Sequence, residues 1–103
     1  MKLHDVDLCD AVKEHRDHKV WIPSSEITKS LRIGDLMKVA CNAERFWVRV
    51  KKVEAAGEYL GTVHDILLQK ELNYGMLISV SHIHIYDVMT IADQRASKAI
   101  LKR

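Results

Sequence analysis

The stretch LRIGDLMKV, residues 31–39, is followed later in the chain by a second stretch of the same form, LNYGMLISV, residues 72–80. Both have the pattern Leu-x-x-Gly-x-Leu-x-x-Val, and they are called here the first copy and the second copy. Glycine adopts backbone conformations that cost other residues free energy, so it suits a sharp entry into a strand. We interpret the two copies as two strand entries that frame a compact, mostly β unit.

The size and composition of the chain predict one globular domain. Its 103 residues are 48% hydrophobic and 29% charged, which is ordinary for a domain with a single core. The net charge of +2 comes from 16 basic and 14 acidic residues, which argues against a strongly cationic nucleic-acid binder but permits a local basic patch. No segment approaches the roughly 20 apolar residues that span a bilayer, and the N-terminus does not read as a secretory signal. We therefore expect a cytoplasmic protein with no membrane partner.

The spacing of the apolar residues predicts five strands joined as an antiparallel meander with a closing strand. The expected ranges are 36–41, 45–53, 59–63, 76–80 and 85–88. Gly61 is expected at a bend or at a close approach of two backbones. A single 3₁₀ turn at residues 81–82 would bring the apolar residues on either side of it into phase.

Helical spacing predicts helices on either side of these strands. Residues 7–15 read as a short amphipathic helix capped by Asp7. A further short helix begins at Ser24, after the only proline, and its Ile27 is expected to face the core. The apolar residues of 64–74 predict a helical turn over one mouth of the sheet.

The C-terminal segment returns to helical spacing. Thr90 and Asp93 resemble a capping box, and they predict a helix over residues 91–102. Its apolar stripe is narrow and consists mainly of alanine: Ala92, Ala96, Ala99 and Ile100. The expected fold is therefore a single α+β domain over residues 1–103. A five-stranded antiparallel, barrel-like sheet over about residues 20–88 is flanked by an N-terminal and a C-terminal helix.

Four segments carry a resemblance to a known family: Ile22-Pro23-Ser24, LRIGD (31–35), ERFWV (44–48) and YLGTV (59–63). Together they resemble a family of small bacterial domains of unknown function, which have Gly-Asp strand entries, a Glu-Arg-Phe/Met-Trp-Val strand and a closing His-Ile. Here Gly75-Met76 departs from the second Gly-Asp entry, and His82-Ile83 matches the close. The resemblance covers roughly residues 20–88. It implies a small, partly open, SH3-like barrel and no catalytic residues.

The predicted strand 45–53 carries the strongest candidate binding residues. Alternation places Phe46, Val48 and Val50 on one face, and the other face holds Arg45, Trp47, Arg49 and Lys51. Cations interleaved with an aromatic ring suit a nucleic-acid backbone and a stacked base. The alternative is a solvated sheet face with Trp47 partly covered by the terminal helix, and Glu44 and Glu54 are nearby acids that could pair with the cations.

Aromatic residues supply a second candidate surface. Five of them could line a groove or form a homodimer interface: Trp21, Trp47, Tyr59, Tyr74 and Tyr86. Of these, Tyr59 joins Trp47 and its basic neighbours among the expected binding residues.

The histidines and cysteines are the candidate residues for metal binding and catalysis. His64, His82 and His84 with a carboxylate could hold a divalent metal, but the predicted 3₁₀ turn would spoil the geometry at His82. The chain has no Cys-x-x-Cys or His-Glu-x-x-His pattern, and Cys9 and Cys41 are expected to be free thiols without the sequence signature of a nucleophile. We therefore expect no bound metal, no cofactor and no catalytic residue.

These observations predict a non-enzymatic small-barrel module that binds another protein or a second copy of itself. Homo-oligomers would form through the terminal helix or an open sheet edge, because exposed edges need covering. Two alternatives stay open. One is a nucleic-acid-binding protein that uses Arg45–Lys51, and the other is a metal-binding or enzymatic protein that uses His64, His82 and His84.

Overall fold

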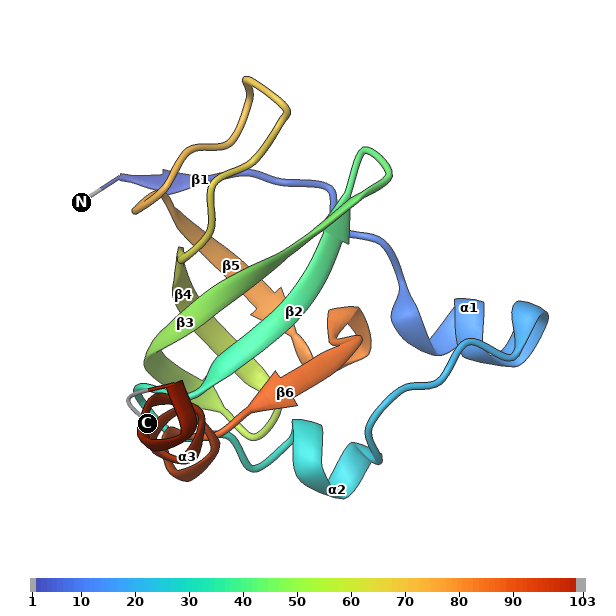
Figure 1. Cartoon of the computed structure of the whole chain (residues 1–103). Helices are drawn as coiled ribbons and strands as arrows, with labels where there is room; N and C mark the ends of the chain where they lie inside the picture. The colour runs from blue at the N-terminus through green and yellow to red at the C-terminus, as the bar shows by residue number, and fades with distance from the viewer. Residues whose placement is uncertain (1, 102–103) are drawn as a thin grey trace.

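The computed structural model describes residues 2–101, and the side chains of its last helix as far as Ala96. Six strands form one mixed sheet in the order β1-β5-β4-β3-β2-β6 (Figure 1). The strands are β1 (Leu3–His4), β2 (Leu36–Cys41), β3 (Glu44–Ala55), β4 (Glu58–Val63), β5 (Leu77–Ser81) and β6 (Asp87–Met89). All five expected strands are present, so the α+β class is confirmed.

The expected count of five antiparallel strands is wrong because the N-terminus adds a parallel strand. β1 pairs with β5 through Leu3↔Leu77 and His4↔Ile78. Two paired residues are too few to give an alternating pattern in the sequence, and β1 is specified by the otherwise free edge of β5. Within the described residues β1 and β6 are the two edges of the sheet, so it is open and not a closed barrel.

The two copies of the repeat make the same backbone hydrogen bonds. The N–H of Gly34 donates to Val50 O, and the N–H of Val50 donates to Asp35 O, both at 2.9 Å. Likewise the N–H of Gly75 donates to Val63 O at 2.7 Å, and the N–H of Val63 donates to Met76 O at 2.9 Å. Gly34 and Gly75 have φ angles of +97° and +89°, which favour glycine. Each glycine therefore starts a strand, β2 or β5, as predicted.

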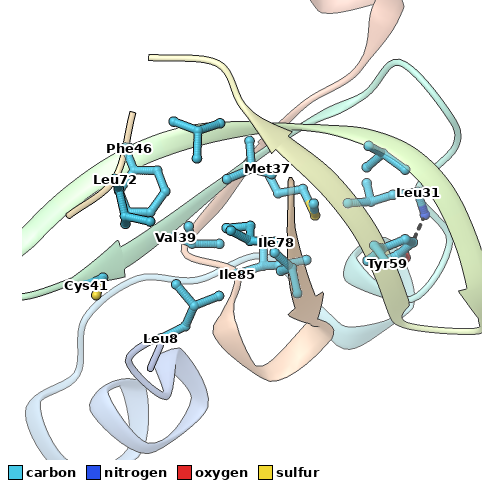
Figure 2. Close-up of a cluster of buried hydrophobic side chains, with 14 residues drawn as sticks. Leu8, Leu31, Met37, Val39, Cys41, Phe46, Tyr59, Leu72, Ile78 and Ile85 are labelled. Carbon is cyan, nitrogen blue, oxygen red and sulfur yellow. Dashed lines mark hydrogen bonds between the residues drawn. The ribbon is translucent and has the colours of Figure 1, made fainter. Parts of the chain in front are cut away.

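The core lies between the curved inner face of the sheet and the segments that connect its strands (Figure 2). Phe46, Val48 and Val50 are fully buried, which confirms the predicted alternation of β3. Gly61 is also confirmed at a close approach, because a Cβ there would lie 2.5 Å from Val48 Cγ1 and 2.7 Å from the Arg49 carbonyl oxygen. The register of β3 on β4 shifts between Val50 and Lys52.

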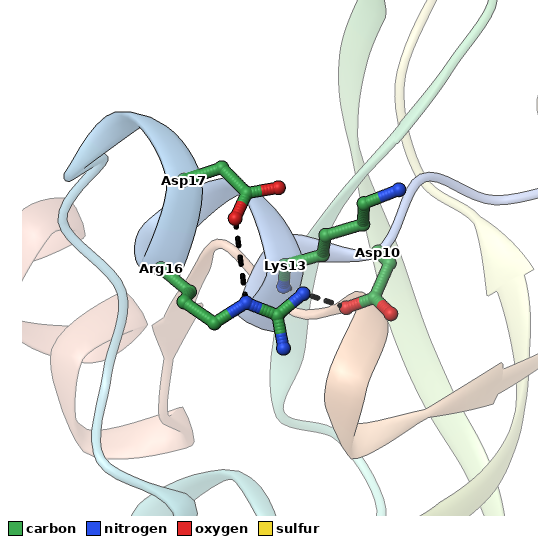
Figure 3. Close-up of polar contacts among 4 residues, drawn as sticks. All are labelled: Asp10, Lys13, Arg16 and Asp17. Atoms are coloured by element: carbon green, nitrogen blue, oxygen red, sulfur yellow. Dashed lines mark hydrogen bonds and ion pairs between the residues drawn. The ribbon is translucent and has the colours of Figure 1, made fainter.

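Two short helices precede β2. In α1 (Ala11–His18) the carboxylate of Asp10 accepts the N–H of Lys13 at 2.9 Å, and Arg16 pairs with Asp17 (Figure 3). The expected start at residue 7 is wrong, since Asp10 and not Asp7 is the N-cap.

The second helix, α2 (Ser25–Thr28), is capped by Ser24 as predicted. Ile27, however, is 47% exposed. The expectation that Ile27 faces the core is wrong because the helix ends after one turn, and Thr28 is the residue of this helix that is buried.

The C-terminal half contains a 3₁₀ turn and a helix. The turn η1 (His82–His84) is found where a 3₁₀ turn was expected. In α3 (Ile91–Leu101) the predicted capping box is present: Thr90 N–H donates to Asp93 Oδ2 at 3.0 Å, and Asp93 N–H donates to Thr90 Oγ1 at 3.2 Å.

The predicted alanine stripe does not attach α3 to the sheet where it is described. Ala92 and Ala96 are exposed, whereas the other two members of the stripe lie outside the described side chains. The amide of Gln94 holds the helix instead, donating to Gly34 O at 3.0 Å and to Met89 O at 3.2 Å. No helix in the described part of the chain is both long enough and apolar enough to cross a membrane.

Candidate functional site

The outer face of β3 carries the basic and aromatic residues that the sequence predicted there. Cross-strand pairing places Trp47 opposite Lys38 and Arg49 opposite Leu36 of β2. Trp47 is half-buried, and the ammonium of Lys38 lies 4.9 Å from the centroid of its ring. One side of the indole is therefore already occupied by a cation from the protein itself.

The acidic residues of β3 do not neutralise this face. Glu54 pairs with Lys52 at 3.8 Å. The carboxylate of Glu44 accepts the backbone N–H groups of Leu68 at 2.7 Å and Gln69 at 3.1 Å, and the Leu68 bond is the main reason that its pKa is lowered. Within residues 2–101, no carboxylate lies within 4.0 Å of the side-chain nitrogens of the four cations around Trp47: Lys38, Arg45, Arg49 and Lys51.

Arg45 has a separate, structural environment on this face. Its guanidinium carbon lies 4.4 Å from the centroid of the Tyr86 ring. The Tyr86 hydroxyl donates to the carboxylate of Glu14 in α1, and burial, together with this bond, raises the pKa of Tyr86. Arg45 therefore stacks on a cluster that joins α1 to the sheet.

Tyr59 is not part of the outer face. It is 1% exposed, its hydroxyl donates to Thr28 O at 2.6 Å, and it accepts the N–H of Leu31 at 3.1 Å. Tyr59, expected among the binding residues, is therefore separated from Trp47 and its basic neighbours and lies in the core. Its role is to fix the turn of the first copy to the core.

A groove of about 280 Å³ opens beside Arg49, where β3 and β4 meet the turn of the second copy. Its lining comes from β3, from the end of β4 and from the turn before β5: Arg49, Lys51, Thr62, Val63, His64, Tyr74 and Gly75. Tyr74 is 63% exposed at the rim. Lys51 lies where the register of β3 on β4 shifts, so it has no directly paired residue on β4.

A chain of hydrogen bonds links three of the residues around this groove. Arg49 Nη2 lies 3.2 Å from His64 Nε2, and the Tyr74 hydroxyl lies 3.2 Å from His64 Nδ1. Because a guanidinium only donates, Nε2 accepts, and the proton of neutral His64 is on Nδ1, where it is donated to the Tyr74 oxygen. Burial first, and then the charge of Arg49, lowers the pKa of His64 and so favours this neutral form.

The loop over residues 64–76 borders the groove and projects beyond the sheet, on the same side as β1 and the β2–β3 hairpin (Figure 1). The expected helical turn is wrong, because two carboxylates bind backbone N–H groups of the loop. Glu44 holds residues 68 and 69, and Asp65 accepts Trp47 N–H at 3.2 Å and Ile66 N–H at 3.0 Å. The loop is therefore fixed to β3 at both carboxylates.

The apolar side chains of this loop divide between the core and the solvent. Leu72 is buried and Leu67 packs against the core. Ile66 and Leu68 are 89% and 95% exposed. The anchored loop thus presents two aliphatic side chains outward, close in sequence to the groove-lining residue His64.

The histidines considered for metal binding are not gathered at one place. His64 follows the end of β4 that pairs near Leu77, whereas His82 and His84 lie at the other end of β5. The ring of His84 accepts Ser81 N–H at 3.1 Å, so it caps η1. No group of three or more His, Cys, Asp or Glu side chains that could hold a metal ion occurs among the described residues.

The thiols are also placed by the structure. Both cysteines are free, and Cys41 is buried. Burial raises the pKa of the Cys41 thiol, which disfavours the thiolate that a nucleophile requires.

Sequence reasoning did not predict the meeting of Arg49, His64 and Tyr74. The available signal was the repeat itself, because Tyr74 occupies in the second copy the turn position that exposed Ile33 occupies in the first. The chain matches no protein-family model, no curated protein and no solved structure.

Proposed function

We propose that this protein is a non-enzymatic interaction module that binds an acidic protein segment at the 64–76 loop and the adjoining groove. The observation that carries the proposal is the near-complete exposure of Ile66 and Leu68, at 89% and 95%, on a loop whose backbone is anchored. Burying two such side chains against a partner would remove apolar surface from water, at roughly 25 cal/mol per Å². We also propose that the chain is a member of the SH3-like family that its sequence resembles.

The anchoring matters because ordering a flexible loop on binding costs free energy. Here the carboxylates of Glu44 and Asp65 already hold four backbone N–H groups of the loop and of β3. A partner would therefore meet a preformed surface and lose less affinity to ordering.

The charge next to the loop favours an acidic partner. Arg49 and Lys51 border the groove, and no carboxylate within residues 2–101 lies within 4.0 Å of their side-chain nitrogens. Such cations steer an acidic segment toward the surface and select against a basic one.

Nucleic acid is the second candidate ligand. It is favoured by one observation: within residues 2–101, the four cations around Trp47 have no carboxylate within 4.0 Å. Against it, Lys38 already lies over the Trp47 ring, which leaves less aromatic surface for a base. A nucleic-acid ligand would also leave the exposure of the aliphatic side chains of the loop unexplained.

Selection from a displayed random-peptide library tests the proposal. We expect enrichment of acidic peptides that contain apolar residues, and about a tenfold or greater loss of affinity in the double variant Ile66→Ser/Leu68→Ser. Ile33→Ser is the matched control, because Ile33 is also exposed but lies in the turn of the first copy.

Three outcomes would reject the proposal. The first is equal binding of the selected peptides to the double variant and the wild-type protein. The second is tight, strongly salt-dependent binding of a single-stranded oligonucleotide that is unaffected by the double variant, which would favour nucleic acid. The third is sedimentation of the wild-type protein as a dimer and of the double variant as a monomer, which would assign the loop to a homo-oligomer interface.

A further inference from the structure

The groove beside Arg49 brings together hydrogen-bond donors with few acceptors to satisfy them. Arg49 donates a hydrogen bond from Nη2 to His64, which leaves the other N–H groups of its guanidinium available to a ligand. The ammonium of Lys51 is exposed and has no carboxylate within 4.0 Å in the described chain. Since His64 donates to the Tyr74 oxygen, the Tyr74 hydroxyl proton is free to be donated to a ligand.

These groups come from three segments that the fold holds in fixed positions. Arg49 and Lys51 are on β3, His64 follows β4, and Tyr74 is in the turn that Gly75 N–H fixes to Val63 O at 2.7 Å. The carboxylate of Asp65, next in sequence to His64, accepts Trp47 N–H and Ile66 N–H and does not line the groove. The groove is therefore cationic and rich in donors.

We propose that this groove binds a phosphorylated side chain of the protein partner. Arg49 and Lys51 offset the charge of the phosphoryl group, the Tyr74 hydroxyl donates a hydrogen bond to it, and His64 is a positioning residue that orients both Arg49 and Tyr74. The inference rests on the proposed function, and it adds the chemical class of the group that the groove selects.

A phosphoryl group fits this set of donors better than a carboxylate does. It carries nearly two negative charges at neutral pH and three acceptor oxygens, whereas a carboxylate carries one charge and two oxygens. Two cations and one hydroxyl donor can all be used at once by a phosphoryl group. A peptide is favoured over a nucleic acid as its source because exposed aliphatic side chains follow His64 in the adjoining loop.

Titration with small blocked amino acids tests the groove alone, without the apolar loop. The probes are N-acetyl-phosphoserine methylamide, N-acetyl-glutamate methylamide and N-acetyl-serine methylamide, and binding is followed by backbone amide NMR shifts. We expect saturable shifts at Lys51, Thr62 and Gly75 with the phosphoserine probe, at about tenfold higher affinity than with the glutamate probe, and none with the serine probe.

Lys51→Gln and Lys52→Gln form a matched pair, because they remove the same charge from adjacent residues of β3. We expect Lys51→Gln to lower the affinity for the phosphoserine probe by about fivefold to tenfold, and Lys52→Gln to lower it by less than about twofold. Lys51 borders the groove, whereas Lys52 pairs with Glu54. Both side chains are exposed, so neither substitution threatens the fold.

The positioning role of His64 has its own test. Glutamine carries a donor and an acceptor, so His64→Gln should retain most of the affinity that His64→Leu loses. Equal losses in these two variants would reject that role.

Two results with the probes would overturn the phosphoryl assignment: equal affinities for the phosphoserine and glutamate probes, or equal losses in Lys51→Gln and Lys52→Gln. Failure of the proposed function would be distinguishable from these results. In that case Ile66→Ser/Leu68→Ser would leave peptide binding unchanged whatever the probes do. A 5′-phosphorylated oligonucleotide that outcompetes a phosphopeptide would assign the groove to nucleic acid and overturn the peptide assignment.

Discussion

The turns of the two copies have the same backbone and different surroundings. In both, the glycine N–H and the carbonyl of the following residue bind one residue of a neighbouring strand, which is Val50 for the first copy and Val63 for the second. In both, the residue before the glycine is exposed: Ile33 is 61% and Tyr74 is 63% exposed. The shared sequence pattern therefore builds the same turn twice.

What differs is the cover over each turn. A Cβ on Gly34 would lie 2.9 Å from Ile91 Cδ1 of α3, whereas one on Gly75 would meet no atom of the described residues within 4 Å. The carboxylate of Asp35 is buried and accepts Arg32 N–H at 2.8 Å and Ile91 N–H at 3.0 Å. At the same position of the second copy, the side chain of Met76 accepts one N–H group, that of Asn73, at its sulfur.

One turn is tied to α3 and closes the fold, whereas the other is the turn that we propose to be open to a ligand. Asp35 connects the first turn to the start of α3, so that turn is structural. Among the described residues no helix lies over Gly75, and the second turn brings Tyr74 to the groove that we propose as a binding site. Matching substitutions in the two turns test this difference between a structural turn and a turn open to a ligand.

The largest expected difference is between Asp35→Ala and Met76→Ala. Asp35→Ala leaves two backbone N–H groups without an acceptor, and we expect the free energy of unfolding to fall by about 3 kcal/mol. Met76 is half-buried, and Met76→Ala should cost at most about 2 kcal/mol. Urea denaturation measures both, and a cost for Met76→Ala that equals or exceeds that of Asp35→Ala would contradict this difference between the turns.

The two glycines give the next test. Each has a positive φ, so Gly75→Ala should lower the free energy of unfolding by about 1 kcal/mol from backbone strain alone. Gly34→Ala should cost about 2 kcal/mol, because Ile91 must also move aside. Equal costs in thermal or urea unfolding would show that α3 does not press on the first turn.

Two tyrosine hydroxyls provide a smaller contrast. Tyr59→Phe removes the acceptor of Leu31 N–H and the donor to Thr28 O inside the core, and should cost about 1.5 kcal/mol. Tyr74→Phe removes an exposed hydroxyl and should change the free energy of unfolding by less than about 0.5 kcal/mol. It should also lower the affinity for the phosphoserine probe. A large stability loss in Tyr74→Phe would make the second turn structural as well.

The smallest expected effect is a pH dependence at His64. Folding lowers the pKa of His64 through burial and the charge of Arg49, so the unfolded chain takes up a proton at a higher pH than the folded protein does. The free energy of unfolding should therefore fall as the pH is lowered through the ordinary value of 6.5, and level off below the folded pKa.

Arg49→Gln should raise the pKa of His64 toward that ordinary value, and Lys52→Gln should raise it less. An NMR titration of the His64 ring measures both. An unchanged pKa in Arg49→Gln would mean that the Arg49–His64 contact is not maintained in solution.

Much of the fold was predictable because it rests on local signals. The alternation in ERFWVRV predicted which side chains of β3 are buried, since successive residues of a strand point to opposite faces. Ser24 and the pair Thr90–Asp93 predicted the starts of α2 and α3, since caps bind backbone groups within three residues. The candidate site was predicted only in part: Arg49 and Lys51 were included, whereas His64 was a metal-ligand candidate and Tyr59, expected among the binding residues, is buried.

The two glycine turns, the alternating strands and the helix starts follow from local sequence, because each depends on the conformational preferences of a few neighbouring residues. Long-range packing sets which turn α3 covers, how β1 pairs with β5, and that Arg49, His64 and Tyr74 meet. His64 and Tyr74 lie near the two ends of a loop whose path is set by the carboxylates of Glu44 and Asp65. Such contacts between distant residues leave no periodic trace in the chain, and they alone bring together the side chains of the proposed binding groove.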